Sequence, residues 1–414
     1  MDKFVIEGPN KLKGEVKVSG AKNSALPILI ATLLTDKECV VKHVPCLRDI
    51  KTTIKLLEYL GKKVHFKNNT VTVRKNKPLK TKAPYNLVKQ MRASFLVAGP
   101  LLTRFKHTQV PLPGGCAIGL RPIDIHLGGF AKMGAKSETK KGDIVIKAKK
   151  LHSAVIKLPY QSVGATENLI LCAVMVSGKT IIKNFAKEPE ITDLVNFLNS
   201  MGADIKINKT TITINGVKQL HGTQHAIIPD RIEAGTYLIA SALTKGNVTV
   251  SNCNPSHLKS LITALRKAGT KITVNKNKIS VAPSTIKSIN VKTEPYPGFP
   301  TDLLSQWTVL MCRAKGQAKI SESIFENRFM HIAELGRMDT LIAVDSHTAL
   351  IDYTRQLLGA NVMASDLRGG AALVLAGLIA KGTTTVDRIY HIDRGYEKME
   401  EKLSNLGASI KRIK

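Results

Sequence analysis

The chain has 414 residues, more than one hydrophobic core usually serves, and this length predicts two or three domains. Its content of 43% hydrophobic and 22% charged residues indicates a soluble globular protein and excludes an intrinsically disordered one. The net charge of +31 raises the possibility of nucleic-acid binding.

The N-terminal sequence MDKFVIEGPNKLKGEVKV lacks the apolar core and the small-residue cleavage site of a signal peptide. The longest apolar stretches, ALPILIATLL and AALVLAGLIA, are too short to cross a bilayer. We therefore expect a cytoplasmic protein with no membrane partner.

The segment SGAKNSALP, residues 19–27, predicts the start of a helix with Lys22 and Asn23 in its first turn. Unpaired N–H groups and the helix dipole favour an anion at this end, and Lys22 adds a full positive charge. A lysine at a solvated helix end would look the same, so this segment alone does not establish a binding site.

One pattern recurs along the whole chain: a short β-branched strand, an amphipathic helix, a glycine and a β-hairpin. The clearest copies begin at residues 178, 246 and 382, and weaker ones begin near residues 37, 108 and 316. The residues that end the six helices are Gly61, Gly134, Gly202, Gly269 and Gly407, with Asp339 where a sixth glycine would fall. These positions lie 67 to 73 residues apart.

Glycine ends a helix well because the residue after the last turn adopts a left-handed conformation, which carries no Cβ penalty in glycine. Asp339 tolerates that conformation better than most residues, at some cost in stability. Because solenoid repeats span only about 20–50 residues, a period near 70 favours compact βαβαββ units instead. The expected fold class is α/β, with six such units in two domains of three.

Two equivalent segments mark the expected crossings between the domains. Residues 19–34 and 229–243 each lead from polar residues into a helix rich in small side chains. We expect one domain to comprise residues 22–229, with the Cys116 loop, and the other to comprise residues 1–21 and 230–414.

The segment PLPGGCAIGLRP, residues 111–122, has three glycines and three prolines and is predicted to be a loop. Cys116 lies five residues before Arg121, and a nearby cation lowers a thiol pKa and makes the group a useful acid or nucleophile. The alternative is a buried cysteine in a structural turn. The other cysteines show no CxxC pair or metal-ligand spacing. We expect Cys39, Cys172, Cys253 and Cys312 to be reduced core thiols and assign Cys46 no role.

A second unusual loop, YPGFPTD at residues 296–302, ends in Asp302. This carboxylate could be a general base or only a helix N-cap. Arginines occur at other turns, and arginine binds carboxylate and phosphate groups through two parallel hydrogen bonds. Several of them indicate a polyanionic ligand, although the sequence does not show that they converge. They are Arg92, Arg328, Arg368 and Arg394.

The excess lysines are scattered over expected hairpins and exposed helix faces, as in KKVHFKNN and KSETKKGD. No aromatic residues interleave them and no nucleic-acid-binding motif accompanies them. We interpret them as a solvated surface, and expect no specific nucleic-acid partner. A positive field would also attract an anionic substrate.

Ten motifs together resemble the enolpyruvyl transferase family that acts on UDP-N-acetylglucosamine. The resemblance runs from about residue 4 to residue 412. The motifs are GEVKVSGAKNSALPIL, QMRASFLVAGPLL, PLPGGCAIGLRPIDIH, SVGATEN, KEPEITDLVNFLNSMGA, IPDRIEAGT, PYPGFPTD, FENRFMH, DLRGGAALVLAGL and RIYHIDRGYE. The resemblance implies an inside-out α/β barrel in two domains, a cleft between them, and neither a metal nor an organic cofactor.

The implied reaction transfers the enolpyruvyl group of phosphoenolpyruvate to the 3-hydroxyl of UDP-N-acetylglucosamine and releases phosphate. By resemblance, Asp302 is the base at the sugar hydroxyl, and Cys116 is the proton donor, which can carry a covalent adduct. Lys22, Arg121 and Arg394 match the cations that hold phosphoenolpyruvate, with Asn23 beside them.

Further positions match residues that contact the nucleotide sugar or line the cleft. They are Arg92, Arg121, Pro122, Ile123, Asp124, Ile125, Ser162, Val163, Asp302, Ile324, Arg328, Asp366 and Arg368. Tyr160 and Gln161 match only weakly. A cysteine at position 116 also implies alkylation by the epoxide fosfomycin. Asp339 and Thr340 depart from the Gly-Ala usual in the family, which bears on stability more than on chemistry.

Three alternatives stay open. The related enzyme type that uses shikimate 3-phosphate shares the fold and the donor but lacks the PGGC loop and the SGAKN segment. A catalytically silent relative would serve as a binding module. A nucleic-acid-binding protein is suggested by charge alone, and only binding specific to sequence or structure would support it.

Overall fold

The structure is a computed structural model that describes residues 2–114, 119 and 122–414. The predicted site residues Cys116 and Arg121 therefore lie outside the described residues. The chain divides into two compact units. We call residues 20–114 and 122–228 the continuous unit, and residues 2–19 and 229–414 the discontinuous unit. Among the described residues, no helix has the length and apolar character needed to cross a membrane.

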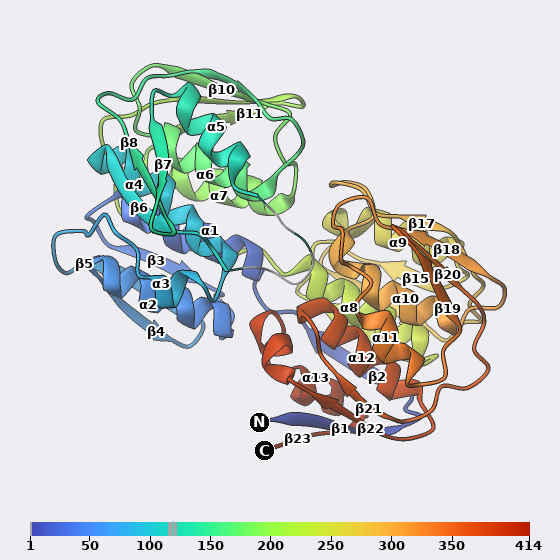
Figure 1. The fold of residues 1–414 in the computed structure, drawn as a ribbon. Helices are drawn as coiled ribbons and strands as arrows, with labels where there is room; N and C mark the ends of the chain where they lie inside the picture. The colour runs from blue at the N-terminus through green and yellow to red at the C-terminus, as the bar shows by residue number, and fades with distance from the viewer. Residues whose placement is uncertain (1, 115–118, 120–121) are drawn as a thin grey trace. The chain divides into compact units, whose positions relative to one another are not determined.

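The described strands of the continuous unit form three sheets (Figure 1). The strands are β3 (Cys39–Lys42), β4 (Lys62–Lys67), β5 (Thr70–Lys75), β6 (His107–Pro111), β7 (Lys136–Lys140), β8 (Asp143–Lys147), β9 (Val155–Lys157), β10 (Lys179–Lys183), β11 (Asp204–Ile207), β12 (Thr211–Asn215) and β13 (Gln224–Ala226). The helices are α1 (Lys22–Ala31), η1 (Thr32–Leu34), α2 (Arg48–Leu60), α3 (Tyr85–Val88), η2 (Arg92–Val97), α4 (Ala98–Phe105), α5 (Asp124–Lys132), α6 (Val163–Ala173) and α7 (Pro189–Ser200).

The described part of the discontinuous unit also has three sheets. Its strands are β1 (Lys3–Gly8), β2 (Lys13–Lys17), β14 (Asn247–Ser251), β15 (Lys271–Val274), β16 (Lys278–Ala282), β17 (Val291–Lys292), β18 (Ala318–Ser321), β19 (Ile342–Asp345), β20 (Thr348–Ile351), β21 (Asn361–Met363), β22 (Gly382–Asp387) and β23 (Ser409–Ile413). Its helices are α8 (Arg231–Leu243), η3 (Pro255–Leu258), α9 (Lys259–Lys267), η4 (Thr301–Leu303), α10 (Leu304–Cys312), α11 (His331–Gly336), α12 (Leu367–Ile379), η5 (Ile389–Arg394) and α13 (Met399–Asn405).

One strand order recurs in these sheets. In β11-β12-β10-β9 a hairpin pairs antiparallel with β10, and β9 runs parallel to β10 on the far side. The sheet β23-β1-β22-β21 has the same order, but β1 from the N-terminus completes it (Figure 1). The first and last strands of the chain are therefore neighbours, and the recurring unit closes across the termini.

The core of each unit contains helices that are buried nearly all round, unlike the amphipathic helices at the edges. In the discontinuous unit these are α8, α10 and α12, which pack on one another. In the continuous unit α4 packs on α6, and nine of the ten residues of α1 are buried. A helix that is apolar on all sides needs this environment. The closed inside-out barrel implied by the resemblance stays a prediction.

The six predicted helix ends adopt the expected conformation. The φ angles are positive at Gly61 (115°), Gly134 (92°), Gly202 (95°), Gly269 (96°) and Gly407 (92°), and also at Asp339 (62°). The prediction that Asp339 takes the left-handed position in place of a glycine is confirmed.

The cysteine predictions hold for the residues that the structure describes. Cys39, Cys172, Cys253 and Cys312 are buried free thiols, whereas Cys46 is exposed. Burial raises the pKa of Cys172 and that of Cys312 to about 12. These thiols are therefore protonated core residues.

Candidate active site

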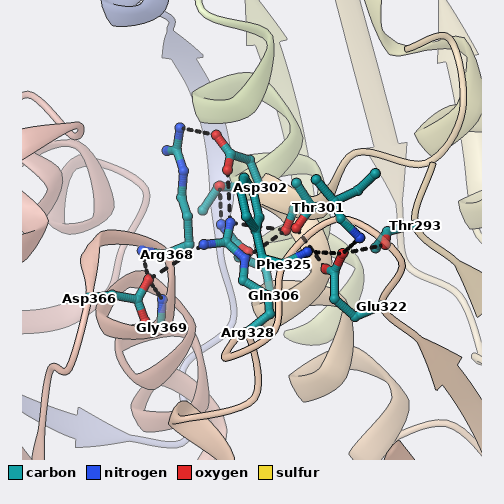
Figure 2. A network of polar contacts seen from close by, with 12 residues as sticks. Thr293, Thr301, Asp302, Gln306, Glu322, Phe325, Arg328, Asp366, Arg368 and Gly369 are labelled. Atoms are coloured by element: carbon teal, nitrogen blue, oxygen red, sulfur yellow. Dashed lines mark hydrogen bonds and ion pairs between the residues drawn. The ribbon is translucent and has the colours of Figure 1, made fainter. Parts of the chain in front are cut away.

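The loop that follows β17 places Asp302 in η4, directly before the buried helix α10. Its carboxylate lies between two arginines (Figure 2): Oδ1 is 2.8 Å from Nη2 of Arg328, and Oδ2 is 3.0 Å from Nη2 of Arg368. Both arginine side chains are almost fully buried, while that of Asp302 is 28% exposed. The carboxylate therefore remains accessible from one side.

The two arginines determine the charge of Asp302. Burial by itself raises its pKa, but the charges of Arg368 and Arg328, together with the hydrogen bond from Arg368, hold the pKa of this carboxyl well below its usual range. Burial lowers the pKa of Arg368, yet Asp302 and other groups raise it overall. At neutral pH the site therefore holds an ionised carboxylate between the two arginine side chains.

The helix N-cap interpretation of Asp302 is wrong. No side chain caps η4, and the Asp302 carboxylate faces arginines rather than helix N–H groups. The cap in this cluster is Asp366, whose Oδ1 accepts hydrogen bonds from the backbone N–H groups of Arg368 (2.9 Å) and Gly369 (3.1 Å) at the start of α12. The cap thus fixes the helix turn that carries Arg368.

Arg328 is held by the loop that carries Asp302. Its Nε and Nη2 donate to the carbonyl oxygen of Thr301 at 3.1 and 3.0 Å, and its Nη1 lies 3.8 Å from Asp366. Neighbouring His331 is completely buried, and burial lowers its pKa well below its usual range, so its ring is neutral. Among the described residues, Nε and Nη1 of Arg368 have no hydrogen-bond partner.

The loop of Ile324 is fixed by buried Glu322 (Figure 2). This carboxylate accepts from Thr293 (2.8 Å) and Thr301 (2.7 Å) side chains and from the backbone N–H groups of Ile324 (2.5 Å) and Phe325 (3.2 Å). One carboxylate thus connects the Ile324 loop to the loop of Asp302. Arg394 ends η5 in the same unit and is half-buried.

In the continuous unit, Lys22 is the first residue of α1, as predicted, with half-buried Asn23 next to it. The Nζ of Lys22 lies 2.6 Å from Oδ2 of Asp49 in the first turn of α2, and both side chains are less than 10% exposed. The expected cation is therefore present but shares its charge with a buried carboxylate.

The other predicted residues of this unit lie at helix starts. Arg92 begins η2 and donates from Nη2 to the carbonyl oxygen of Pro122 at 2.9 Å. Pro122 is exposed, Ile123 and Ile125 are buried, and exposed Asp124 is the first residue of α5. At α6, the hydroxyl of Ser162 accepts from the Ala165 backbone N–H at 3.4 Å, and half-buried Val163 begins the helix. Tyr160 is exposed and Gln161 is half-buried.

The structure therefore brings together Asp302, Arg328, Asp366 and Arg368, and places Ile324 in a loop bonded to theirs. The predicted residues of the continuous unit gather at helix N-terminal ends, where the dipole favours anions. Whether the two sets share one cleft stays a prediction. Within the described residues, no cluster of three or more His, Cys, Asp or Glu side chains could hold a metal ion.

Sequence reasoning missed several residues that support this site. Asp49 shows a usable signal, because it lies on the apolar face of α2 with Thr53, Leu56 and Leu60 at helical spacing, where an acid needs a partner. Gln306 and Tyr396 are also buried polar residues, but no sequence pattern marks them as such.

Comparison with known proteins identifies the family. The family model of EPSP synthase (3-phosphoshikimate 1-carboxyvinyltransferase) matches residues 6–403. The chain belongs to the EPSP synthase family. Within this family, it is 56% identical over 416 residues to UDP-N-acetylglucosamine 1-carboxyvinyltransferase of Elusimicrobium minutum, covering 100% of this chain and 99% of that protein. It is 54% identical to the protein of the same name from Endomicrobium trichonymphae, covering 100% of both.

Solved structures support the family fold. The enolpyruvyl transferase NikO from Streptomyces tendae superposes with a TM-score of 0.90 at 24% identity, covering 99% of this chain and 98% of that one. EPSP synthase from Acinetobacter baumannii gives a TM-score of 0.77 at 18% identity, covering 100% of both chains. At these identities the likeness concerns the fold alone, and it supports the predicted two-domain α/β class.

Proposed function

We propose that this protein transfers the enolpyruvyl group of phosphoenolpyruvate to the 3-hydroxyl of UDP-N-acetylglucosamine and releases inorganic phosphate, a reaction of peptidoglycan synthesis. The observation that carries the proposal is the 56% identity, along the whole chain, to a relative named for this activity. The Asp302 cluster, formed by Asp302, Arg328, Asp366 and Arg368, supports the proposal because it holds an ionised carboxylate that suits the role of the base.

The reaction is an addition followed by an elimination. The sugar hydroxyl oxygen bonds to C2 of phosphoenolpyruvate, C3 gains a proton, and the hydroxyl proton passes to a base. The C2–O bond to phosphate then breaks while C3 loses a proton, which restores the double bond in the product. The reaction therefore needs a base at the hydroxyl, an acid at C3 and cations for the phosphate and carboxylate groups.

Asp302 is the proposed base. It is ionised at neutral pH, because Arg328 and Arg368 hold its pKa low, and so it is able to accept a proton. The same arginines make it a weak base in the resting site. It therefore takes the hydroxyl proton as the bond to C2 forms, when the hydroxyl becomes acidic, which is the behaviour of general-base catalysis.

The remaining roles follow the resemblance and stay proposals. Lys22, Arg121 and Arg394 would hold phosphoenolpyruvate, and Cys116 would protonate C3 or carry the covalent adduct. A fosfomycin adduct identified by mass spectrometry at Cys116, together with loss of activity, would support the role of that thiol. Retained activity after prolonged exposure would contradict it.

The proposal also includes the cofactor requirement, the cellular compartment and nucleic-acid binding. No metal or organic cofactor takes part in the addition or the elimination as written, so we expect activity to persist in a chelator. Phosphoenolpyruvate and a nucleotide sugar are cytoplasmic metabolites, which sets the proposed compartment. Nucleic acid has no part in the reaction, and binding measured at several salt concentrations would separate specific affinity from attraction to a +31 chain.

The deciding experiment is a phosphate-release assay with phosphoenolpyruvate and either UDP-N-acetylglucosamine or shikimate 3-phosphate. We expect release only when phosphoenolpyruvate and the nucleotide sugar are both present, and a large loss in Asp302→Ala and in Cys116→Ser. Release with shikimate 3-phosphate instead would favour the other acceptor. No release with either acceptor would favour a catalytically silent relative.

A further inference from the structure

Next to the Asp302 cluster lies a set of buried neutral polar groups from three segments of the discontinuous unit. We call Thr236, Gln306 and Tyr396 the tyrosine network. Thr236 lies on α8, Gln306 on α10, and Tyr396 two residues after η5. All three side chains are at most 1% exposed. Nothing in the proposed chemistry uses them directly, so their burial needs another explanation.

The donor and the acceptor of each hydrogen bond in the tyrosine network can be assigned. The Thr236 hydroxyl donates to the carbonyl oxygen of Ile232 at 2.9 Å, which uses its single hydrogen. The Tyr396 hydroxyl, 2.9 Å from Thr236 Oγ1, must therefore donate to Thr236. Nε2 of Gln306 donates to Tyr396 at 2.9 Å and to Thr236 at 3.1 Å. Burial raises the pKa of Tyr396, which keeps this proton in place.

The network contacts the Asp302 cluster through Tyr396. The guanidinium carbon of Arg368 lies 5.3 Å from the centroid of the Tyr396 ring, within the range of a cation–π contact. Gln306 lies on α10, which begins directly after η4 and Asp302. Arg368 in turn contacts Asp302 at 3.0 Å.

We propose that Gln306, Thr236 and Tyr396 are positioning residues, which fix the Tyr396 ring against Arg368 and thereby hold Asp302 in the orientation that accepts the hydroxyl proton. The inference rests on the proposed function, because it assigns a step of that reaction. Arg368 has a long side chain with many rotamers, and only one of its nitrogens contacts Asp302. Packing against the fixed Tyr396 ring restricts the rotamers of Arg368 without placing another charge beside it.

The first test compares Tyr396→Phe with Tyr237→Phe in the intact protein. Tyr237 is a matched control, because it is a fully buried tyrosine of α8 whose hydroxyl has no hydrogen-bond partner among the described residues. We expect Tyr396→Phe to lower kcat about tenfold, the effect of one lost hydrogen bond, with KM for both substrates changed less than about threefold. Tyr237→Phe should leave kcat within about twofold of the wild type.

The second test repeats Tyr396→Phe in an Arg368→Lys background. If Tyr396 acts through Arg368, its substitution should cost less than about twofold in kcat there, because coupled residues are not additive. An equal loss in both backgrounds, or an unchanged kcat in Tyr396→Phe alone, would overturn the inference. Should Arg368→Lys have no measurable activity, the kcat and KM values of Tyr396→Phe alone decide.

The wild-type assay separates this inference from the proposed function. A wild type that releases no phosphate with both substrates refutes the function itself. A wild type that is active, with a Tyr396→Phe variant of equal kcat, refutes only the positioning role. Gln306→Met should reproduce the kcat loss of Tyr396→Phe, because it removes the donor to Tyr396 and keeps the side-chain length.

Discussion

Asp302 and Lys22, one in each unit, both form ion pairs, but the number of partners and the exposure of the two side chains differ. Asp302 faces two arginines and keeps an exposed side, whereas buried Lys22 faces one buried acid, Asp49. Asp302 is thus paired with two arginines, of which Arg328 also lies near Asp366, while Lys22 is paired with the carboxylate of Asp49. The comparison indicates that the Asp302 cluster is preformed, and it predicts that an anion at Lys22 has to compete with Asp49.

The largest expected effect is that of Asp302→Asn. Losing a general base costs about 100- to 10,000-fold, so we expect kcat to fall by at least about 100-fold. The change also removes the negative charge between two buried guanidinium groups, although Arg328 keeps Asp366, and it should lower the free energy of unfolding by about 3 kcal/mol. Phosphate release and denaturant unfolding measure the two effects.

A matched control is Asp345→Asn, which changes an exposed aspartate of the same unit. It should leave kcat unchanged and alter stability by less than about 0.5 kcal/mol. If Asp302→Asn kept wild-type kcat, Asp302 would not be the base, and the preformed site in the comparison would have only a structural role.

The next effect concerns Asp49→Asn. Asp49→Asn removes the acid of a buried ion pair, so we expect a loss of about 3 kcal/mol in unfolding free energy. An anion at the start of α1 should then replace Asp49. Inorganic phosphate should therefore raise the thermal midpoint of Asp49→Asn more than that of the wild type, as measured by calorimetry.

The double variant Lys22→Met, Asp49→Asn sharpens this prediction. It removes both charges and should be more stable than Asp49→Asn alone, because neither charge is then buried without a partner. Equal phosphate shifts in the wild type and in Asp49→Asn would show that Lys22 does not bind anions there. The contrast between the two ion pairs would then have no functional meaning.

Local features of this fold were predictable from the sequence. The left-handed helix ends at the five glycines and at Asp339, and the position of Lys22 at the start of α1, depend on neighbouring residues only. The ion pairs were not, because Asp302 lies 26 residues from Arg328 and 66 from Arg368, and nothing local indicates which partner an acid will find. The N-cap interpretation of Asp302 failed for the same reason.

A third buried charge extends the comparison. Lys62 is 1% exposed, and its Nζ donates to the carbonyl oxygen of Thr35 at 2.5 Å rather than to an acid. Burial lowers its pKa to about 8. The unfolded chain has a lysine pKa of about 10.4, so the folded state prefers the neutral amine. Below pH 8 the buried, protonated Lys62 lowers the free energy of unfolding by its full amount. This penalty decreases as the pH rises from 8 and is absent above about 10.4.

We expect the free energy of unfolding of the wild type, relative to Lys62→Met, to rise by about 3 kcal/mol between pH 7.5 and pH 10.5. Denaturant unfolding of both proteins at several pH values measures this difference, and the subtraction removes the titration of the other lysines. A difference that stays constant with pH would mean that Lys62 keeps its charge when buried. The contact with Thr35 would then be sufficient, and a buried cation would need no acid here.

The smallest expected effect concerns Asp339, which affects stability through its backbone conformation. Asp339 is exposed and adopts φ = 62°, where the other helix ends have glycine. A left-handed residue with a Cβ is strained, and Asp tolerates this better than most, so Asp339→Gly should raise the free energy of unfolding by about 0.5–1 kcal/mol. Gly407→Asp makes the reverse change at a helix end where an added Cβ would lie 3.9 Å from its nearest neighbour, and it should cost a similar amount. Because neither residue takes part in the proposed chemistry, kcat should not change in either variant. A stability gain accompanied by an altered kcat would mean that this helix end also influences the active site. The different ion pairs of the two units would then not account for all of the activity of the protein.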